Sequence, residues 1–274
     1  MLVTLAPHGS FAALSGGRIV GTAIGIDYGG FSWIAMMLVA PEYRGRGLGR
    51  RLLQAALEAV PAHTPLRLDA TPLGRPLYQA FGFEDETAIT RWVADSSSRV
   101  LPALAGSASA FHVRRLSGAD FPALAVQDRG VFGANRRTVL EWALDAAPGY
   151  AYAIDGGASA FPAQYCLGRP GRLFDQIGPV VAVSDEAAQA LAREALHAAR
   201  GGAVVMDLFD VERSVGAWLQ ACGFHVQRPL FRMRLPPRIT AGRRAELLPR
   251  ETARDDQKHV AHLREFATLG PDFA

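Results

Sequence analysis

The sequence contains few cysteines and almost no lysine. Its two cysteines, Cys166 and Cys222, are too few for a disulfide framework, and their spacing does not fit the CxxC pattern of a metal site. We therefore expect a reducing, cytoplasmic environment and no bound metal. Lys258 is the only lysine, so almost all of the positive charge sits on arginine, whose guanidinium group suits contacts with phosphate.

Long apolar runs and strong charge clusters are also absent. No stretch approaches 18 uninterrupted apolar residues, and residues 1–11 lack the basic region of an export signal, so we expect neither membrane spanning nor export. The formal net charge is only +3, and no stripe of clustered arginines with interleaved aromatic residues is present. We expect neither a membrane nor a nucleic acid as a partner.

The composition that remains is that of a globular protein with two domains. The chain has 274 residues, 49% of them hydrophobic and 20% charged, which is enough to bury a core and long for one domain. The spacing of apolar residues in the first third predicts the order β-β-α-β-α-β, with elements at residues 18–26, 31–39, 50–60, 66–70, 72–80 and 87–93.

The second part of the chain repeats the first at an offset near 141 residues. The stretch LDATPLGRPLYQAFGF from Leu68 matches FDVERSVGAWLQACGF from Phe209 without a gap, because 209 − 68 = 141. Two α/β halves could share turn residues by chance, but a constant offset favours a tandem duplication. We predict domains at residues 1–94 and 111–237, a linker rich in Ser, Ala and Gly at 95–110, and a tail at 238–274.

A glycine-rich segment follows the second predicted strand and opens a helix. Gly45, Gly47 and Gly49 let the backbone approach a ligand closely, and the helix directs unpaired N–H groups and the positive end of its dipole at the same place. Arginines at 44, 46, 50 and 51 make a diphosphate a better ligand than a single carboxylate. On the glycine pattern alone, an ordinary strand-to-helix turn with solvated arginines is the favoured interpretation, because isolated glycine motifs are weak signals.

The surrounding residues make the pattern more specific. Arg44, Gly47 and Gly49 form R-x-x-G-x-G after a strand, and Tyr78 is followed by Gly82 and Phe83. This resembles the GNAT superfamily of N-acetyltransferases. The resemblance implies an α/β (α+β) fold with two tandem GNAT-like domains, each a mixed, mostly antiparallel sheet flanked by helices. It also implies acetyl-CoA as cosubstrate, with the pantetheine at Leu38 and Val39 and the pyrophosphate at Arg44, Gly45, Arg46, Gly47, Leu48, Gly49 and Arg50.

Tyr78 is the predicted catalytic residue. Acetyl transfer to a primary amine by direct attack needs a proton for the departing thiolate, and a phenol can donate one. The alternative is an aromatic residue that only packs beside Leu77 and Phe81. We expect the acceptor to be a small-molecule or peptide amine, and its identity is open.

The general base is left open by the sequence. Asp69 and Glu42 are the nearby carboxylates, but Asp69 has a counterpart, Asp210, in the second copy, which favours a structural role such as helix capping. Glu42 follows Pro41 in a turn and is expected to be solvated. A proton lost through water, or an amine that arrives neutral, would serve equally well.

The second copy looks like the same fold without the site. Ser184 can cap its helix, and Asp185 and Glu186 place carboxylates where a pyrophosphate would bind, while Leu219 stands at the position of Tyr78. We expect this half to support the first or to shape its acceptor site. A noncatalytic acyl-CoA-binding or regulatory module, or an assembly role, is the alternative function for the whole chain.

The two copies differ at their starts, and the tail is unaccounted for. Residues 113–144 supply an opening strand and two helices to the second copy, whereas 113 − 141 = −28 places the first copy's equivalent about 28 residues before Met1. We therefore expect the first copy to lack these elements. In the tail, apolar residues at 260, 263, 266 and 269 predict a helix over 252–269. This helix would pack in that gap or, as the favoured alternative, be exposed or lie in a homodimer contact.

Overall fold

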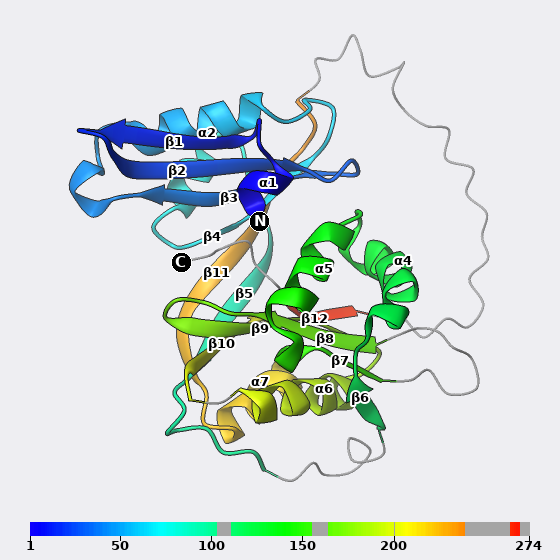
Figure 1. The fold of residues 1–274 in the computed structure, drawn as a ribbon. Helices are drawn as coiled ribbons and strands as arrows, with labels where there is room; N and C mark the ends of the chain where they lie inside the picture. The colour runs from blue at the N-terminus through cyan, green and yellow to red at the C-terminus, as the bar shows by residue number, and fades with distance from the viewer. Residues whose placement is uncertain (103–110, 155–163, 200, 239–263, 269–274) are drawn as a thin grey trace.

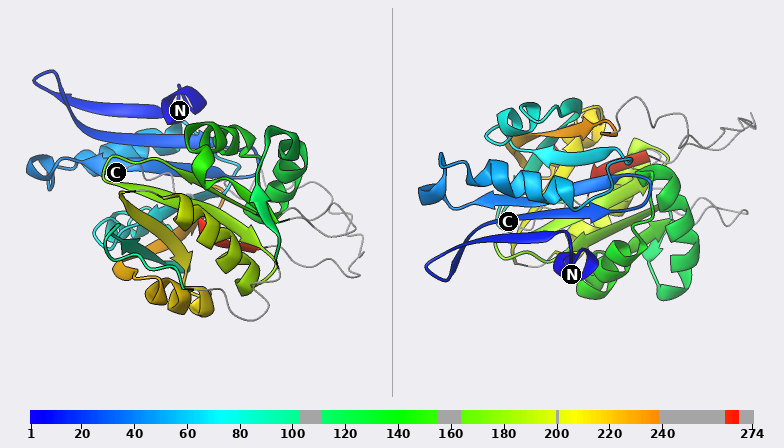
Figure 2. Two further views of the ribbon diagram at one scale, coloured as in Figure 1. Left: turned by 60° about the horizontal axis from the view of Figure 1, so that its bottom comes forward. Right: turned by 90° about the horizontal axis from the view of Figure 1, so that it is seen from above.

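The computed structural model describes residues 1–102, 111–154, 164–199, 201–238 and 264–268. Both halves contribute strands to one twisted sheet, and helices pack on both of its faces (Figures 1 and 2). The two free cysteines, Cys166 and Cys222, are both buried.

The first half begins with a short helix and a three-stranded meander. Its elements are α1 (Leu2–Leu5), β1 (Ser10–Ser15), β2 (Arg18–Asp27), β3 (Ser32–Val39), η1 (Pro41–Tyr43), α2 (Leu48–Glu58), β4 (Leu66–Ala70), α3 (Arg75–Gln79) and β5 (Glu84–Ala94). The predicted order is confirmed for β2 to β5. The prediction missed β1, an edge strand whose burial alternates only weakly.

The second half repeats this order after an opening strand and two helices. Its elements are β6 (Val113–Arg115), η3 (Gly118–Asp120), α4 (Phe121–Phe132), α5 (Arg137–Ala146), η4 (Pro148–Tyr150), β7 (Tyr152–Ile154), β8 (Gln164–Arg169), β9 (Phe174–Ala182), α6 (Asp185–Ala198), β10 (Ala203–Phe209), α7 (Arg213–Ala221) and β11 (His225–Leu235). The strands β5 and β11 are 11 residues each and keep the predicted offset, since 225 − 84 = 141.

The two halves exchange their last strands. The sheet order is β1-β2-β3-β4-β11-β5-β10-β12-β9-β8-β7-β6, so β11 lies beside β4 of the first half and β5 lies beside β10 of the second. The β4–β11 and β5–β10 pairings and the β11–β5 pairing between them are antiparallel. The predicted domain limits at 94 and 111 are therefore limits along the chain, while the sheet is continuous across them.

The prediction of a tail helix is wrong where the structure describes the tail. Arg264–Thr268 forms strand β12, which pairs antiparallel with β9 and with β10. Phe266 and Ala267 are fully buried there, because the open edges of two strands supply backbone partners and apolar cover that the local spacing does not reveal. The remaining residues of the predicted helix lie outside the described residues.

Strands β3 and β4 part after a short parallel contact. They pair only at Ser32 with Leu66 and at Trp33 with Arg67. The equivalent strands β9 and β10 pair in parallel over Phe174–Gln176 and Ala203–Val205, and then β12 lies between them. Each half thus has a wedge-shaped gap between two strands of its sheet, which we call the wedge. In the second half this gap is filled by β12.

The two faces of the first-half sheet are covered by different parts of the chain. Helix α2 covers one face, where Leu53 and Leu66 share a buried cluster with Tyr78. On the opposite face, Leu2 of α1 shares a buried cluster with Trp33, and Phe132 and Ala134, at and just after the end of α4, belong to the same cluster. In the described structure, the second half covers the surface for which the tail helix was proposed.

Candidate active site

A cavity of about 570 Å³ lies in the wedge of the first half. One wall is the free side of β3 from Ile34 to Val39, and the other is the turn after β4 together with α3. Of the predicted site residues, the cavity is lined by Leu38, Val39, Arg44, Gly49 and Tyr78. The fold therefore brings residues that are 40 positions apart in the sequence to one place.

The backbone of β3 is irregular at this cavity. Opposite β2 the register shifts between Thr22 and Ile24, and Met36 has a positive φ of 52°, unusual for a residue with a side chain. The Thr22 hydroxyl donates a hydrogen bond of 2.7 Å to the Met36 carbonyl oxygen. A bulge leaves backbone groups outside the ladder, and here it does so on the wall of the cavity.

The predicted phosphate loop ends at the first turn of α2. Gly47 is the N-cap residue with φ 74°, and Gly45 has φ 73°, so both positions need glycine's tolerance of the left-handed region. No side chain caps the helix, and its first turn has no acidic residue. The leading N–H groups of α2 are thus left for an external acceptor.

The other predicted cofactor residues surround this helix start without lining the cavity. They are Gly45, Arg46, Gly47, Leu48 and Arg50. The guanidinium groups of Arg46 and Arg50 lie over the rings of Tyr43 and Phe81, and the Nε of Arg44 donates to the Val39 carbonyl oxygen at 3.0 Å. These cations are exposed and close to the helix start.

Tyr78 is on α3 and is 7% exposed. Its ring meets the Phe83 ring with centroids 6.0 Å apart, and a Cβ atom at Gly74 would lie 3.1 Å from its Cε2. The tyrosine therefore both packs in the core and borders the cavity, and glycine at the N-cap of α3 leaves room for its ring.

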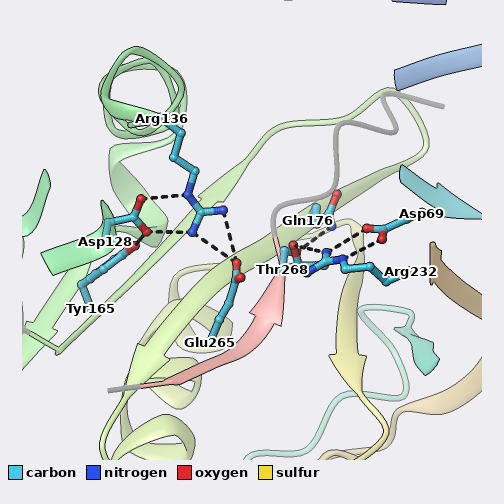
Figure 3. Close-up of polar contacts among 8 residues, drawn as sticks. All are labelled: Asp69, Asp128, Arg136, Tyr165, Gln176, Arg232, Glu265 and Thr268. Atoms are coloured by element: carbon cyan, nitrogen blue, oxygen red, sulfur yellow. Dashed lines mark hydrogen bonds and ion pairs between the residues drawn. The ribbon is translucent and has the colours of Figure 1, made fainter. Parts of the chain in front are cut away.

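Asp69 has a partner that sequence reasoning missed. Its carboxylate accepts hydrogen bonds of 2.9 and 3.0 Å from the Arg232 guanidinium on β11, which also contacts the Thr268 hydroxyl of β12 (Figure 3). The prediction that Asp69 caps a helix is wrong, because α3 has no side-chain cap. No local signal could have indicated this pair, because its members are 163 residues apart.

A second arginine-centred cluster holds the other end of β12. Arg136 donates to both carboxylate oxygens of Asp128 and contacts Glu265, while the Tyr165 hydroxyl bonds to Asp128 (Figure 3). Desolvation, with the Asp128 carboxylate beside it, raises the pKa of Tyr165 well above its usual range. Tyr165 therefore remains a neutral donor that helps to fix this network.

The equivalent helix start in the second half is occupied by the protein's own groups. The Ser184 hydroxyl accepts from the backbone N–H of Ala187 at 3.2 Å, which confirms the predicted cap. Asp185 and Glu186 lie in the first turn, and hydrogen bonds from its own backbone N–H and from Ser184 lower the pKa of Glu186. Leu219, at the position of Tyr78, is fully buried.

Among the described residues there is neither a metal cluster nor a helix that could span a membrane. In that part of the chain, no three His, Cys, Asp or Glu side chains are grouped so that they could hold a metal ion. Across the same ranges, no helix is both long enough and apolar enough to cross a membrane.

Known proteins resemble the chain in both halves. Residues 7–85 match one model of an acetyltransferase (GNAT) domain, and residues 124–248 match another. YitH, an uncharacterized N-acetyltransferase of Bacillus subtilis strain 168, is 28% identical over 199 residues, which cover 72% of this chain and 67% of that protein.

Solved structures share the fold over most of the chain. A putative acetyltransferase from Pyrococcus horikoshii has a TM-score of 0.64 at 23% identity, covering 87% of this chain and 78% of that one. A tandem GNAT protein from the clavulanic acid biosynthesis pathway has a TM-score of 0.57 at 16% identity, covering 84% and 83%. With two matching domain models in series and an N-acetyltransferase homologue, the chain belongs to the GNAT family and is an acyltransferase with two GNAT domains in tandem.

Proposed function

We propose that the first half binds acetyl-CoA in its wedge and transfers the acetyl group to a primary amine by direct attack. The observation that carries this proposal is the cavity that joins the free side of β3, the uncapped start of α2 and the Tyr78 side chain. Only the first half combines these three features in the described structure, so we assign the chemistry to it.

The start of α2 fits a pyrophosphate. Its first-turn N–H groups have no capping side chain, its positive dipole end is uncompensated, and exposed arginines at 44, 46, 50 and 51 surround it. A diphosphate would accept from the backbone and from guanidinium groups together, which are charge-assisted hydrogen bonds.

The free side of β3 fits the pantetheine arm. Beyond Trp33 this strand has no ladder partner on the β4 side, so an extended chain with amide groups can pair with it at Leu38 and Val39. The second half supports this assignment, because β12 pairs in the same way with the equivalent strand β9.

In the proposed reaction, the amine nitrogen forms a bond to the thioester carbonyl carbon and the carbon–sulfur bond breaks. The departing thiolate takes a proton from the Tyr78 hydroxyl, and the proton that the amine loses passes through water and restores this hydroxyl. Asp69 borders the cavity, but both of its carboxylate oxygens accept hydrogen bonds from Arg232. We therefore assign Asp69 a positioning role and not that of the general base. An amine that arrives as the free base needs no protein base.

The test is release of free thiol from acetyl-CoA in the presence of a panel of primary amines, with Tyr78→Phe beside the native chain. Loss of the phenol should lower kcat about 100-fold or more, while the Kd of acetyl-CoA stays the same. Tyr152→Phe, in the second half, removes a phenol elsewhere and should retain full activity. Unchanged kcat in Tyr78→Phe would contradict the assignment of the acid.

A further inference from the structure

A second cavity, of about 550 Å³, lies between the two halves and the tail strand. We name it the interface cavity, and its walls include Trp33, Arg67, Phe132, Glu212, Arg232 and Arg264. Glu212 belongs to the turn between β10 and α7, and Arg264 to β12. The cavity therefore exists only because the second half and the tail pack against the first.

One ion pair joins the wall of the interface cavity to the wall of the wedge cavity in the first half. Arg232 lines the interface cavity, and its partner Asp69 lines the wedge cavity. Along β4, Leu66, Leu68 and Ala70 face the α2 side, so the alternating Asp69 faces the opposite side of the sheet. A molecule in the interface cavity thus lies across the sheet from α2, next to the gap where β3 and β4 part.

Most charged groups of this cavity already have close partners. Arg67 pairs with Glu86 at 2.7 Å, Arg232 with Asp69, and Glu265 with Arg136. Arg264 lies at hydrogen-bond distance from Asp185. The pairing leaves one carboxylate, that of Glu212, with an incomplete set of partners.

Glu212 is 4% exposed, and within the described part of the chain its carboxylate has one ionic partner, Arg264. The distance from Arg264 Nη1 to Glu212 Oε2 is 3.5 Å, longer than a good charge-assisted hydrogen bond, and the Arg264 side chain is half exposed. A nearly buried carboxylate with so few partners lowers the stability of the fold unless a cation completes its hydrogen bonds.

We propose that the interface cavity holds the acceptor, and that the acceptor carries a second cationic group bound by Glu212. This inference rests on the proposed function. Glu212 does not line the wedge cavity, so a cation held by it is separate from the amine that attacks the thioester. The attacking amine must be neutral, whereas an ammonium paired with a carboxylate stays protonated. The acceptor class is therefore a diamine or a longer cationic amine.

The experiment compares two probes of the same length, cadaverine and 1-aminopentane, which differ in one ammonium group. Calorimetry on the native chain loaded with CoA should show cadaverine binding at least about tenfold more tightly, the usual effect of a hydrogen bond to a charged group. Glu212→Gln should remove this preference. Glu141→Gln, which removes a half-exposed carboxylate on α5 outside both cavities, should keep it.

Each outcome decides the inference. Equal binding of the two amines by the native chain, including no binding of either, overturns it, and so does a preference that persists in Glu212→Gln. The loading step tests the proposed function separately, because it measures CoA binding alone. If CoA does not bind, the amines are compared on the free chain, and their preference still tests the cavity.

Discussion

The two halves contain the same wedge and complete it in opposite ways. In the first half, the free side of β3 borders a cavity and the start of α2 has no capping side chain. In the second half, β12 occupies the wedge, Ser184 caps α6, and two carboxylates lie in its first turn. An open strand side and an open helix start therefore need partners, and in the second half the chain itself supplies them.

The largest expected effect on stability comes from removing the side chain that anchors β12. Phe266 is fully buried in the core of the second half, so Phe266→Ala should cost about 3–5 kcal/mol of unfolding free energy. Urea denaturation measures it. The Kd of acetyl-CoA in the first half should not change, and a loss below about 1 kcal/mol would mean that β12 is not held in the wedge.

Blocking the open helix start should remove ligand stabilisation. Acetyl-CoA at 100 times its Kd should add about 2.7 kcal/mol to the native chain, and Gly47→Glu should abolish this through charge repulsion. Gly47→Ala is the control, because both variants place a side chain at a φ of 74°, with a strain of about 1–2 kcal/mol. Thermal melts with and without acetyl-CoA separate the effect of strain from the effect of charge. If acetyl-CoA still raises the melting temperature of Gly47→Glu, the ligand binds elsewhere.

Removing the internal cap should have a smaller effect. Ser184→Ala leaves the N–H of Ala187 without its side-chain acceptor and should cost about 1 kcal/mol. Urea unfolding detects this loss. Ser10→Ala is the control. It removes a serine hydroxyl that donates to the Ala6 carbonyl oxygen and lies outside both helix starts. An unchanged midpoint for Ser184→Ala would show that water replaces the cap.

The smallest expected effect concerns pH and the interface cavity. Burial raises the pKa of Glu212, so the folded state binds this proton more tightly than the unfolded state. Its ionisation therefore destabilises the fold at neutral pH, and the penalty disappears as the pH falls through the raised folded value. Glu212→Gln should be more stable than the native chain at pH 7, and the difference should shrink near pH 4. A difference that grows on acidification would contradict this sign.

Local patterns were sufficient wherever the chemistry is local. The glycine spacing around Gly47 and the Ser184 cap depend on a few consecutive residues, whose backbone preferences and hydrogen-bonding groups are visible in the sequence. The constant offset of the duplication continues in the structure from β5 to β11. The strand order, the β12 pairing and the Asp69 partner could not be obtained in this way.

The repeated β-α-β order, the resemblance to the family, and which half has an uncapped helix start follow from the amino-acid sequence alone. The exchange of the last strands, the strand at Arg264–Thr268 and the pairing of Arg232 with Asp69 depend on the three-dimensional fold. The physical reason is that strand edges and buried ion pairs choose partners by proximity in space. A short apolar run such as the one around Phe266 is compatible with a helix or a strand until open strand edges offer it backbone hydrogen bonds.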